Sequence, residues 1–275
     1  MIFKLVPPSP LLNRYVRHYQ LIHFTFAGAD EKPVKPYPPR PEQCIIFYPR
    51  DLMSIEYQAT QKKVHLPRSI VAGQVITRQN LHLGNDHMVF KIVFYPGALF
   101  HFTNLPLTHI TDENVDAESI FSKEMRLLND RLSGIPDFKT MVDQVEEFLL
   151  KALHRSNAGS DSIDAIAKIL LREPDRFSMK WLAKESCFSL RQFERNFNQR
   201  IGVSPKLFAR ISRFDKAFRL KDKNPRMDWL RIAMETGYHD YQHLVKDFKN
   251  FADVLPNSLI QEEALSPDRY FGFRE

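Results

Sequence analysis

Eight side chains in the last third of the chain have the types and spacing that recognition of DNA bases requires. Four of them follow one another at steps of three, one and three residues, and so share one face of a helix: Arg191, Glu194, Arg195 and Asn198. The same four positions recur 51 residues later along the chain: Gln242, Val245, Lys246 and Lys249. Both sets lie beside an apolar stripe, so each predicted helix has a packed side and a solvent-facing side.

These residue types match the chemistry of base edges. An arginine such as Arg191 or Arg195 can donate two hydrogen bonds to guanine, and Gln242 can pair with adenine in the same way. Glu194 can accept from cytosine N4, Val245 can contact a thymine methyl group, and lysines can bind guanine or phosphate. The expected DNA-contacting set is Ser189, Arg191, Gln192, Glu194, Arg195, Asn198, Tyr241, Gln242, Val245, Lys246 and Lys249.

Two alternatives remain open for this set. Arg195 is also placed to form an ordinary surface ion pair with Glu185 or Glu194. Glu194 places a carboxylate toward a polyanion, which is equally compatible with a solvated side chain that contacts no base.

The two helices belong to a unit that the chain contains twice. Phe193, Arg195, Phe197 and Pro205 recur, all at an offset of 51, as Leu244, Lys246, Phe248 and Pro256. The preceding pairs Leu182-Ala183 and Ile232-Ala233 are offset by only 50, so the second copy has one extra residue between its two helices, where a turn belongs. Two short helices joined by a tight turn, with basic residues on the second, predict a helix-turn-helix that enters the major groove.

Helical periodicity and capping residues give the elements that position these side chains. Helices are expected over 161–172, 178–187, 189–201, 204–221, 228–237 and 240–252. Ser189, Ser204 followed by Pro205, and Asp240 mark helix starts, and Gly237 marks a helix end. If the helix over 204–221 is rigid, it places the recognition helices in successive major grooves, about 34 Å apart, and B-form DNA must bend or one helix must lie on phosphates.

The first part of the chain has a different pattern. Strands are expected over 43–49, 69–77 and 88–96, an extended loop over the proline-rich residues 33–41, and a helix with an apolar stripe over 138–152. The predicted fold is an α+β domain, a small β-sheet or barrel plus helices, followed by an all-α domain with two helix-turn-helix units. We expect a sensor or dimerisation domain over 1–155, a linker over 156–162 and a DNA-binding domain over 163–275.

Charge and composition favour the same class of partner. Residues 178–249 contain 16 Lys and Arg against 8 Asp and Glu, a local net charge of +8 in a chain whose net charge is +6. A basic excess that coincides with the repeat favours nucleic acid over a merely solvated surface. Only Cys44 and Cys187 occur, which excludes a disulfide framework, and both are expected to be buried. No run of about 18 apolar residues and no signal-peptide pattern occurs, so the protein is expected to stay in the cytoplasm.

The duplicated region resembles the DNA-binding domain of the AraC/XylS family of bacterial transcription regulators. The similarity lies in WLAKESCFSLRQFERNFNQRIGVSPKLF, RFDKAF and IAMETGYHDYQHLVKDFKNFADVLP and covers about 100 residues. It implies control of transcription initiation through contacts with RNA polymerase, in a bacterial protein that is nucleoid-associated when bound to DNA. Asp253 and Leu255 stand where the family usually has glycine and serine, which predicts a distorted end of the second unit, and Cys187 stands at a turn often occupied by glycine. The segment 89–115 resembles, more weakly, a sheet domain found ahead of this module, which implies a sensing or dimerisation role without naming an effector.

The residue patterns that metal binding and catalysis require do not occur in the sequence. The sheet region has seven histidines but no HxH pair, and the spacings in PGALFHFTN each differ by one residue from a cupin metal motif. Neither a metal nor another cofactor is therefore expected. His101 is expected to be an interior histidine. No phosphate loop, nucleophile elbow or dinucleotide fingerprint occurs, so catalysis is not expected. The alternative is a cupin-like enzyme or binding protein with a helical docking domain. The stripe over 138–152 approximates heptad spacing, so it predicts either packing on the sheet domain or the interface of a homodimer.

Overall fold

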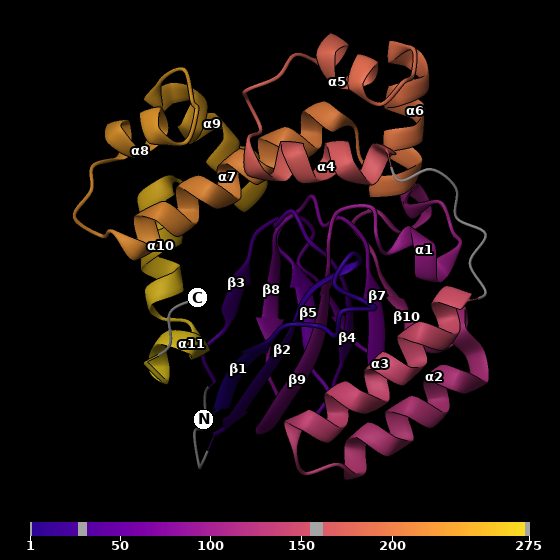
Figure 1. The fold of residues 1–275 in the computed structure, drawn as a ribbon. Helices are drawn as coiled ribbons and strands as arrows, with labels where there is room; N and C mark the ends of the chain where they lie inside the picture. Colours follow the sequence, from indigo (N-terminus) through magenta and orange to yellow (C-terminus); the bar gives the residue numbers. More distant parts are fainter. Residues whose placement is uncertain (1, 27–31, 155–161, 273–275) are drawn as a thin grey trace.

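Two antiparallel β-sheets face each other in the first part of the chain, and helices occupy the last part (Figure 1). The structure is a computed structural model, and it describes residues 2–26, 32–154 and 162–272. The larger sheet has the strand order β1 (Ile2–Val6), β2 (Val16–Thr25), β9 (Asp86–Phe94), β4 (Gln43–Phe47), β7 (Ser69–Ala72) and β10 (Asn114–Asp116). The smaller sheet has the order β3 (Lys35–Tyr37), β8 (Gln79–His82), β5 (Ser54–Tyr57) and β6 (Lys62–His65).

Alternation along the central strands decides what each face of the larger sheet contacts. On β9, Phe90 and Ile92 belong to the core beneath the helices, whereas Val89 and Val93 belong to the core between the two sheets. Successive side chains of a strand point to opposite faces, so Lys91, between Phe90 and Ile92, points toward the smaller sheet. A charged residue in a central strand is thereby placed inside the sheet domain, where it is only 7% exposed.

The predicted strands are confirmed in part. Those over 43–49 and 88–96 correspond to β4 and β9, but the strand expected over 69–77 ends at Ala72. The chain turns away there because Gly73 lies against the backbone of Ile110, where a Cβ would be 2.1 Å from the carbonyl oxygen. The proline-rich residues 33–41, expected to be a loop, contain β3. Pro36 is tolerated in that strand because β3 lies at the edge of its sheet and pairs only with β8.

Helices cover the outer face of the larger sheet. They are α1 (Phe100–Thr103), the 3₁₀ helix η1 (Leu107–Ile110), α2 (Ala117–Gly134) and α3 (Phe138–His154). Val145 and Leu149 of α3 are fully buried in the core beneath this layer, and Val142 is 9% exposed in it. The predicted packing of this stripe on the sheet domain is therefore confirmed, and these side chains are not available as a homodimer interface.

The six helices predicted in the last part of the chain are all present. They are α4 (Ser162–Arg172), α5 (Met179–Glu185), α6 (Leu190–Ile201), α7 (Pro205–Lys223), α8 (Trp229–Glu235) and α9 (Tyr241–Ala252). Ser189, Ser204 and Asp240 cap α6, α7 and α9 as predicted, and Gly237 follows the end of α8 in the left-handed region. Two further helices, α10 (Pro256–Ala264) and α11 (Pro267–Tyr270), were not predicted. The expected linker over 156–162 lies outside the described residues, except for Ser162.

Each helix-turn-helix unit has its own core, and α7 runs between them (Figure 1). Phe193 and Phe197 of α6 are fully buried in the first core, and Phe248 of α9 is fully buried in the second. Two half-buried side chains pack against both cores: Leu207 of α7, and Ile76 from the loop between β7 and β8. The sheet domain therefore contributes an apolar side chain at the junction of the two units.

The expectations for four residues, Cys44, Cys187, Asp253 and Leu255, have unequal outcomes. Cys44 is buried as predicted, but Cys187 is exposed, which corrects the prediction. Cys187 follows the end of α5 with a φ of 59°, a left-handed conformation that leaves its side chain at the surface. Asp253 also has a φ of 59°, and its counterpart Gly202 in the first unit has a φ of 94°. The end of the second unit therefore keeps the left-handed turn, although Leu255 provides no side-chain cap for α10 where Ser204 caps α7.

Candidate nucleic-acid interface

The first recognition helix, α6, presents most of the predicted contact residues to solvent. Arg191, Glu194 and Arg195 are exposed, and Phe193 and Phe197 on the other side are fully buried. Asn198 is half-buried, and its Oδ1 is buried with no hydrogen-bond partner among the described residues. The exposed face of α6 is thus its first two turns, the end of a recognition helix that contacts base edges.

Two of the predicted contact residues on α6 also stabilise its start. The Ser189 hydroxyl accepts from the Gln192 backbone N–H at 3.3 Å, and Gln192 Oε1 accepts from the Ser189 backbone N–H at 3.1 Å. This reciprocal pair is a capping box, which satisfies two backbone N–H groups at the helix start. Both side chains remain exposed, so capping and DNA contact are compatible at these positions.

The second recognition helix, α9, has the same arrangement at the positions 51 residues later. Tyr241, Gln242, Lys246 and Lys249 are exposed, and Val245 is half-buried. The Asp240 carboxylate caps the helix by accepting from the His243 backbone N–H at 2.8 Å. Periodicity and duplication therefore predicted the solvent-facing side of both helices.

The ion pair proposed as an alternative for Arg195 is not formed. Within residues 2–26, 32–154 and 162–272, Arg195 makes no ion pair with Glu185 or Glu194. Arg200, one and a half turns further along the same helix, is 8% exposed and donates to Asp164 at 3.0 Å. One helix thus carries an arginine directed to solvent and an arginine with a structural role.

A buried carboxylate that sequence analysis did not identify holds the second unit on the connecting helix. Asp247 of α9 is 4% exposed and accepts from Arg210 of α7 at 2.7 Å, and Arg213 of α7 lies 3.6 Å from its other oxygen. Arg213 also lies over the ring of Tyr238 at 4.3 Å. Asp247 lies on the buried side of α9, between the exposed Lys246 and the buried Phe248. A carboxylate next to the apolar stripe of a helix is the sequence signal that could have identified it.

The sheet domain contacts the end of α6 through backbone carbonyls. Gln43 Nε2 donates to the Ile201 carbonyl at 2.9 Å, and the Thr111 hydroxyl donates to the Gly202 carbonyl at 2.7 Å. Gln43 Oε1 accepts in turn from the Gly97 backbone N–H, so its amide is fixed on both sides. Unpaired carbonyls at a helix end are costly when buried, and here the sheet domain supplies their donors.

A buried polar triad joins three parts of the chain at the same junction. His101 Nε2 of α1 lies 2.7 Å from Asp164 Oδ2 of α4, and Arg200 of α6 donates to Asp164 Oδ1. All three residues are less than 10% exposed, and the Arg200 guanidinium lies 4.7 Å from the Phe100 ring centre. The prediction that His101 is an interior histidine with a hydrogen-bond partner is confirmed.

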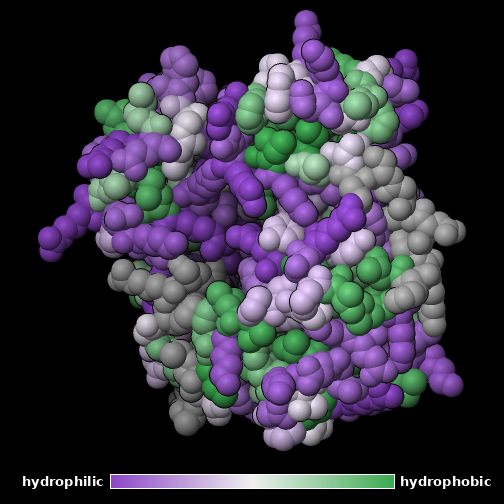
Figure 2. All heavy atoms as spheres, in the orientation of Figure 1, coloured by the Kyte–Doolittle hydropathy of each residue, from purple (hydrophilic) through white to green (hydrophobic). Residues whose placement is uncertain are grey.

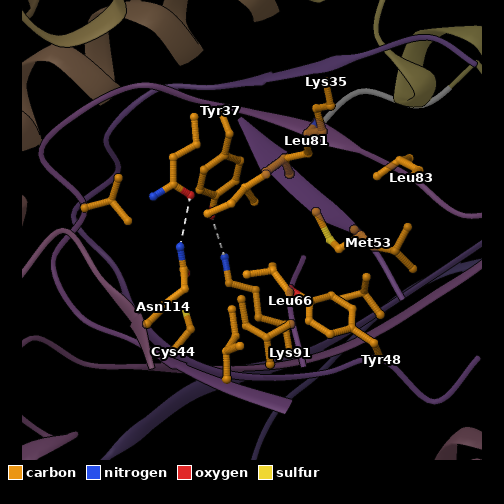
Figure 3. Close-up of a pocket in the computed structure, with 18 of the residues that line it drawn as sticks. Lys35, Tyr37, Cys44, Tyr48, Met53, Leu66, Leu81, Leu83, Lys91 and Asn114 are labelled. Carbon is orange, nitrogen blue, oxygen red and sulfur yellow. Dashed lines mark hydrogen bonds between the residues drawn. The ribbon is translucent and has the colours of Figure 1, made fainter. Parts of the chain in front are cut away.

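A cavity lies between the two sheets, close to these junctions (Figure 3). The centres of water-sized molecules can occupy about 100 Å³ of this cavity, so it has room for several waters or a small organic molecule. Its walls are mainly apolar side chains from both sheets, including Ile22, Phe24, Met53, Leu66, Leu81 and Val89. Figure 3 shows Lys91 and Tyr37 pointing toward each other across it from opposite sheets, 3.1 Å apart.

The polar end of the cavity is connected to α7. Glu42 accepts from Lys91 Nζ at 2.6 Å, and Arg219 of α7 lies 3.7 Å from the other Glu42 oxygen. Burial opposes ionisation of Glu42, but Lys91, Arg40 and Arg219 outweigh it and hold the pKa of Glu42 below its ordinary range. The carboxylate therefore stays charged, and it bridges the cavity lysine and the connecting helix.

The surface of the helical part is mainly hydrophilic on the face that Figure 2 shows, and its apolar patches are small and separate. Across the described ranges, no group of three His, Cys, Asp or Glu side chains has the geometry to hold a metal ion. Nor does any helix in those ranges have the length and apolar content needed to cross a membrane.

Two parts of the chain match known domain families. Residues 182–262 match the model of a helix-turn-helix domain, and residues 4–116 match the model of a domain of unknown function. An uncharacterized HTH-type transcriptional regulator of Haemophilus influenzae is 32% identical to the chain over 114 residues, 41% of this chain and 36% of that relative. The chain thus matches about a third of the length of this curated relative.

Solved structures with a related arrangement include ToxT from Vibrio cholerae O395, at 11% identity and a TM-score of 0.49, with 90% of this chain and 98% of that chain covered. A ToxT structure from Vibrio cholerae strain SCE256 bound to an unsaturated fatty acid has 12% identity, a TM-score of 0.48, and coverage of 94% and 98%. The AraC-like transcriptional activator CuxR has 9% identity, a TM-score of 0.27, and coverage of 76% and 84%. On the duplicated units and the matched domain model, residues 182–262 form a helix-turn-helix domain with two units, the architecture that the resemblance to the AraC family implies.

Proposed function

We propose that the chain is a sequence-specific DNA-binding regulator of transcription, in which α6 and α9 recognise bases and the sheet domain senses a small molecule. The observation that carries the proposal is the matched exposure of both helices. Arg191 and Arg195 on α6, and Gln242 and Lys246 on α9, are directed to solvent while the apolar stripe beside each set is buried. Side chains that serve only the fold would not need the same exposed positions in both copies.

The remaining basic residues support a division of roles. Arg200, Arg210 and Arg213 are engaged with buried carboxylates, so they hold the units together. In the described chain, no ion pair involves Arg191, Arg195, Lys246 or Lys249, whose charge is therefore available to phosphates and base edges. We propose direct base contacts for Arg191, Arg195 and Gln242, and phosphate or guanine contacts for the two lysines.

Further parts of the proposal concern domains and partners. The sheet domain would extend over 1–155 and the DNA-binding domain over 163–275, joined by a linker at 156–162. RNA polymerase and a second copy of the chain are proposed protein partners, on the family resemblance. A cytoplasmic location at the nucleoid follows if the chain binds chromosomal DNA, and no catalytic activity is proposed.

Selection of preferred sites from random duplex DNA with the full chain tests the proposal. Arg195→Ala should lose about 1 to 3 kcal/mol of binding free energy on the selected site and relax the preference at one base position. Arg226→Ala, in an exposed loop between α7 and α8, is the matched control and should keep that preference. No enriched sequence, or equal losses on selected and random DNA for Arg195→Ala, would remove base recognition from α6.

Salt dependence separates this function from docking on an acidic protein. Binding that neutralises several phosphates makes the logarithm of affinity fall steeply and linearly with the logarithm of salt concentration. A shallow dependence would instead favour the alternative in which the helical part docks a protein.

A further inference from the structure

The C-terminal helices α10 and α11 and the two residues that follow them, residues 256–272, form a tail that connects the second helix-turn-helix unit to the sheet domain beside the cavity. Leu259 of α10 is fully buried in the core of that unit, and α11 reaches the sheet domain through Asp268. The two helices lie next to β3 at the edge of the smaller sheet (Figure 1). Phe271, at the end of this segment, stacks on Phe24 with ring centres 4.8 Å apart and contacts Phe26 at 5.2 Å. Phe24 lines the cavity and is 2% exposed, so the tail covers part of the cavity wall.

The tail also places carboxylates on a cavity lysine. Lys35 of β3 lines the cavity and is 6% exposed, and it forms an ion pair with Asp268 of α11. Glu263 of α10 lies 3.7 Å from the same ammonium group. Asp268 is 3% exposed and itself lines the cavity. Burying these charges is costly, and their mutual attraction compensates the cost only while the pair stays together.

We propose that Lys35 is the anion subsite of the cavity, and that Asp268 occupies it as a tethered competitor of a small ligand with one carboxylate and an apolar body. Such a ligand places its carboxylate on Lys35 and its apolar part among the side chains between the sheets, and the tail leaves. The exchange keeps the buried charge balanced, because one carboxylate enters as Asp268 returns to water. A neutral ligand of the same shape brings no carboxylate to replace Asp268 beside Lys35, so it lacks this compensation.

Displacement of the tail reaches the second recognition helix. Arg78, beside the cavity in the loop before β8, pairs with Glu262 of α10 and donates to the Ala252 carbonyl at the end of α9 at 3.1 Å. Trp229 of α8 donates to Asn257 of α10 at 2.6 Å. The tail is therefore attached both to the sheet domain and to α8 and α9, so its release changes how the second unit is held. This regulatory consequence rests on the proposed DNA-binding function, whereas the ligand site does not.

Calorimetric titration of the full chain with 3-phenylpropionate and with 3-phenylpropan-1-ol tests the ligand class. The acid and the alcohol share their apolar body, so the comparison isolates the carboxylate. A charge-assisted hydrogen bond corresponds to about 10- to 100-fold in affinity, so the acid should bind that much more tightly than the alcohol. Lys35→Met removes the charge and keeps the aliphatic part of the side chain, so it should abolish this preference. Equal binding of the two compounds by the wild-type chain, or no binding of the acid by either the wild type or Asp268→Asn, overturns the proposal.

Two tail variants test the competition. Asp268→Asn keeps the size of the side chain and removes its charge, so it should raise the affinity for the acid several-fold. Phe271→Ala weakens the packing of the tail on the sheet domain without altering Lys35, so it should raise the affinity for the acid and for the alcohol together. This variant replaces Asp268→Asn as the test if Asp268→Asn does not fold. Hydrogen exchange of residues 256–272 should increase when the acid binds. Unchanged exchange, or weaker acid binding by both variants, contradicts displacement. Since no measurement here uses DNA, failure of this site and failure of DNA recognition are distinguishable.

Discussion

At the scale of single residues, environment decides which basic side chains face solvent, where the proposed DNA contacts lie, and which hold the fold. Arg195 and Arg200 lie on the same helix, yet Arg195 is exposed and Arg200 is 8% exposed against Asp164. Local periodicity predicted the exposure of Arg195, because it lies two residues, about 200° around the helix, from each of the buried Phe193 and Phe197. The partner of Arg200 is 36 residues away and could not be predicted, because the contact depends on how α4 packs on α6.

Lys249→Ala should weaken binding to selected and random DNA by similar factors. Lys249 lies at the far end of the exposed face of α9, where a lysine reaches phosphates rather than base edges. Loss of one phosphate contact should reduce the slope of log affinity against log salt by about 0.9. Fluorescence anisotropy over a range of salt concentrations measures the slope, with the exposed Lys223→Ala on α7 as control. An unchanged slope would show that Lys249 contacts no phosphate.

Asp247→Asn should lower the free energy of unfolding by about 1 to 3 kcal/mol, the cost of leaving charged partners poorly satisfied at a buried site. Asp247 accepts from Arg210 and faces Arg213, so the change affects the attachment of α9 to α7. Urea denaturation measures the loss. Asp253→Asn, at the exposed end of the same helix, is the control and should change stability by less than about 0.5 kcal/mol.

Stability should fall as the pH decreases from about 6.5 to about 4. Burial lowers the pKa of His87 to about 4, so in this range the unfolded chain binds a proton there that the folded chain does not. Such a group destabilises the fold by up to about 1.4 kcal/mol per pH unit as the pH falls. Urea denaturation from pH 4 to pH 8 should show a shallower dependence for His87→Gln, whereas His239→Gln, whose side chain is 91% exposed, should leave it unchanged. Equal pH profiles for the two variants would contradict this assignment.

At the scale of elements, the helices of the last part were predictable and most strands were not. Ser189, Ser204 and Asp240 determine helix starts through contacts within three residues, so their signals are local. The offset of 51 also relates Pro205, at the start of α7, to Pro256, at the start of α10, so the repeat itself contains a signal for α10. Short strands such as β3 and β10 depend on pairing with distant residues, and their sequences show little alternation.

Cys187→Gly should raise the free energy of unfolding by roughly 0.5 to 1 kcal/mol. Cys187 has a φ of 59°, a conformation that costs a residue with a Cβ about 1 to 2 kcal/mol, and glycine avoids that cost while losing more backbone entropy on folding. Thermal denaturation under reducing conditions measures the gain, and Cys187→Ala, which retains the Cβ, should not reproduce it. A melting temperature for Cys187→Gly at or below that of Cys187→Ala would refute the strain argument.

At the scale of the whole molecule, the sheet domain holds both units by contacts far apart in sequence. Gln43 reaches the Ile201 carbonyl across 158 residues, Thr111 reaches Gly202 across 91 residues, and Arg78 reaches Ala252 across 174 residues. Sequence patterns have no access to such pairs, which explains why the domain types were predicted but their attachment was not. The docked arrangement fixes the recognition helices relative to the cavity.

Thr111→Val should loosen the first unit without unfolding it. The substitution removes the donor to the Gly202 carbonyl and costs about 0.5 to 1.5 kcal/mol. Hydrogen exchange should therefore increase in the last turn of α6 more than around the fully buried Phe193. Thr108→Val, at an exposed position in η1, is the control. Uniform exchange across α6 in both variants would show that the sheet domain does not hold this helix end.

The position of Ile76 against both helical cores has a consequence for evolution. The loop that carries it is fixed by Asp112, whose carboxylate accepts from the backbone N–H groups of Ile76 and Thr77 at 2.8 and 3.0 Å. One aliphatic side chain from outside the helical part thus acts as a spacer between its two halves. A larger or smaller residue at this position would alter the pitch between α6 and α9. If these helices read DNA as proposed, it would also alter the number of base pairs separating the two half-sites, without any change in a residue proposed to contact a base.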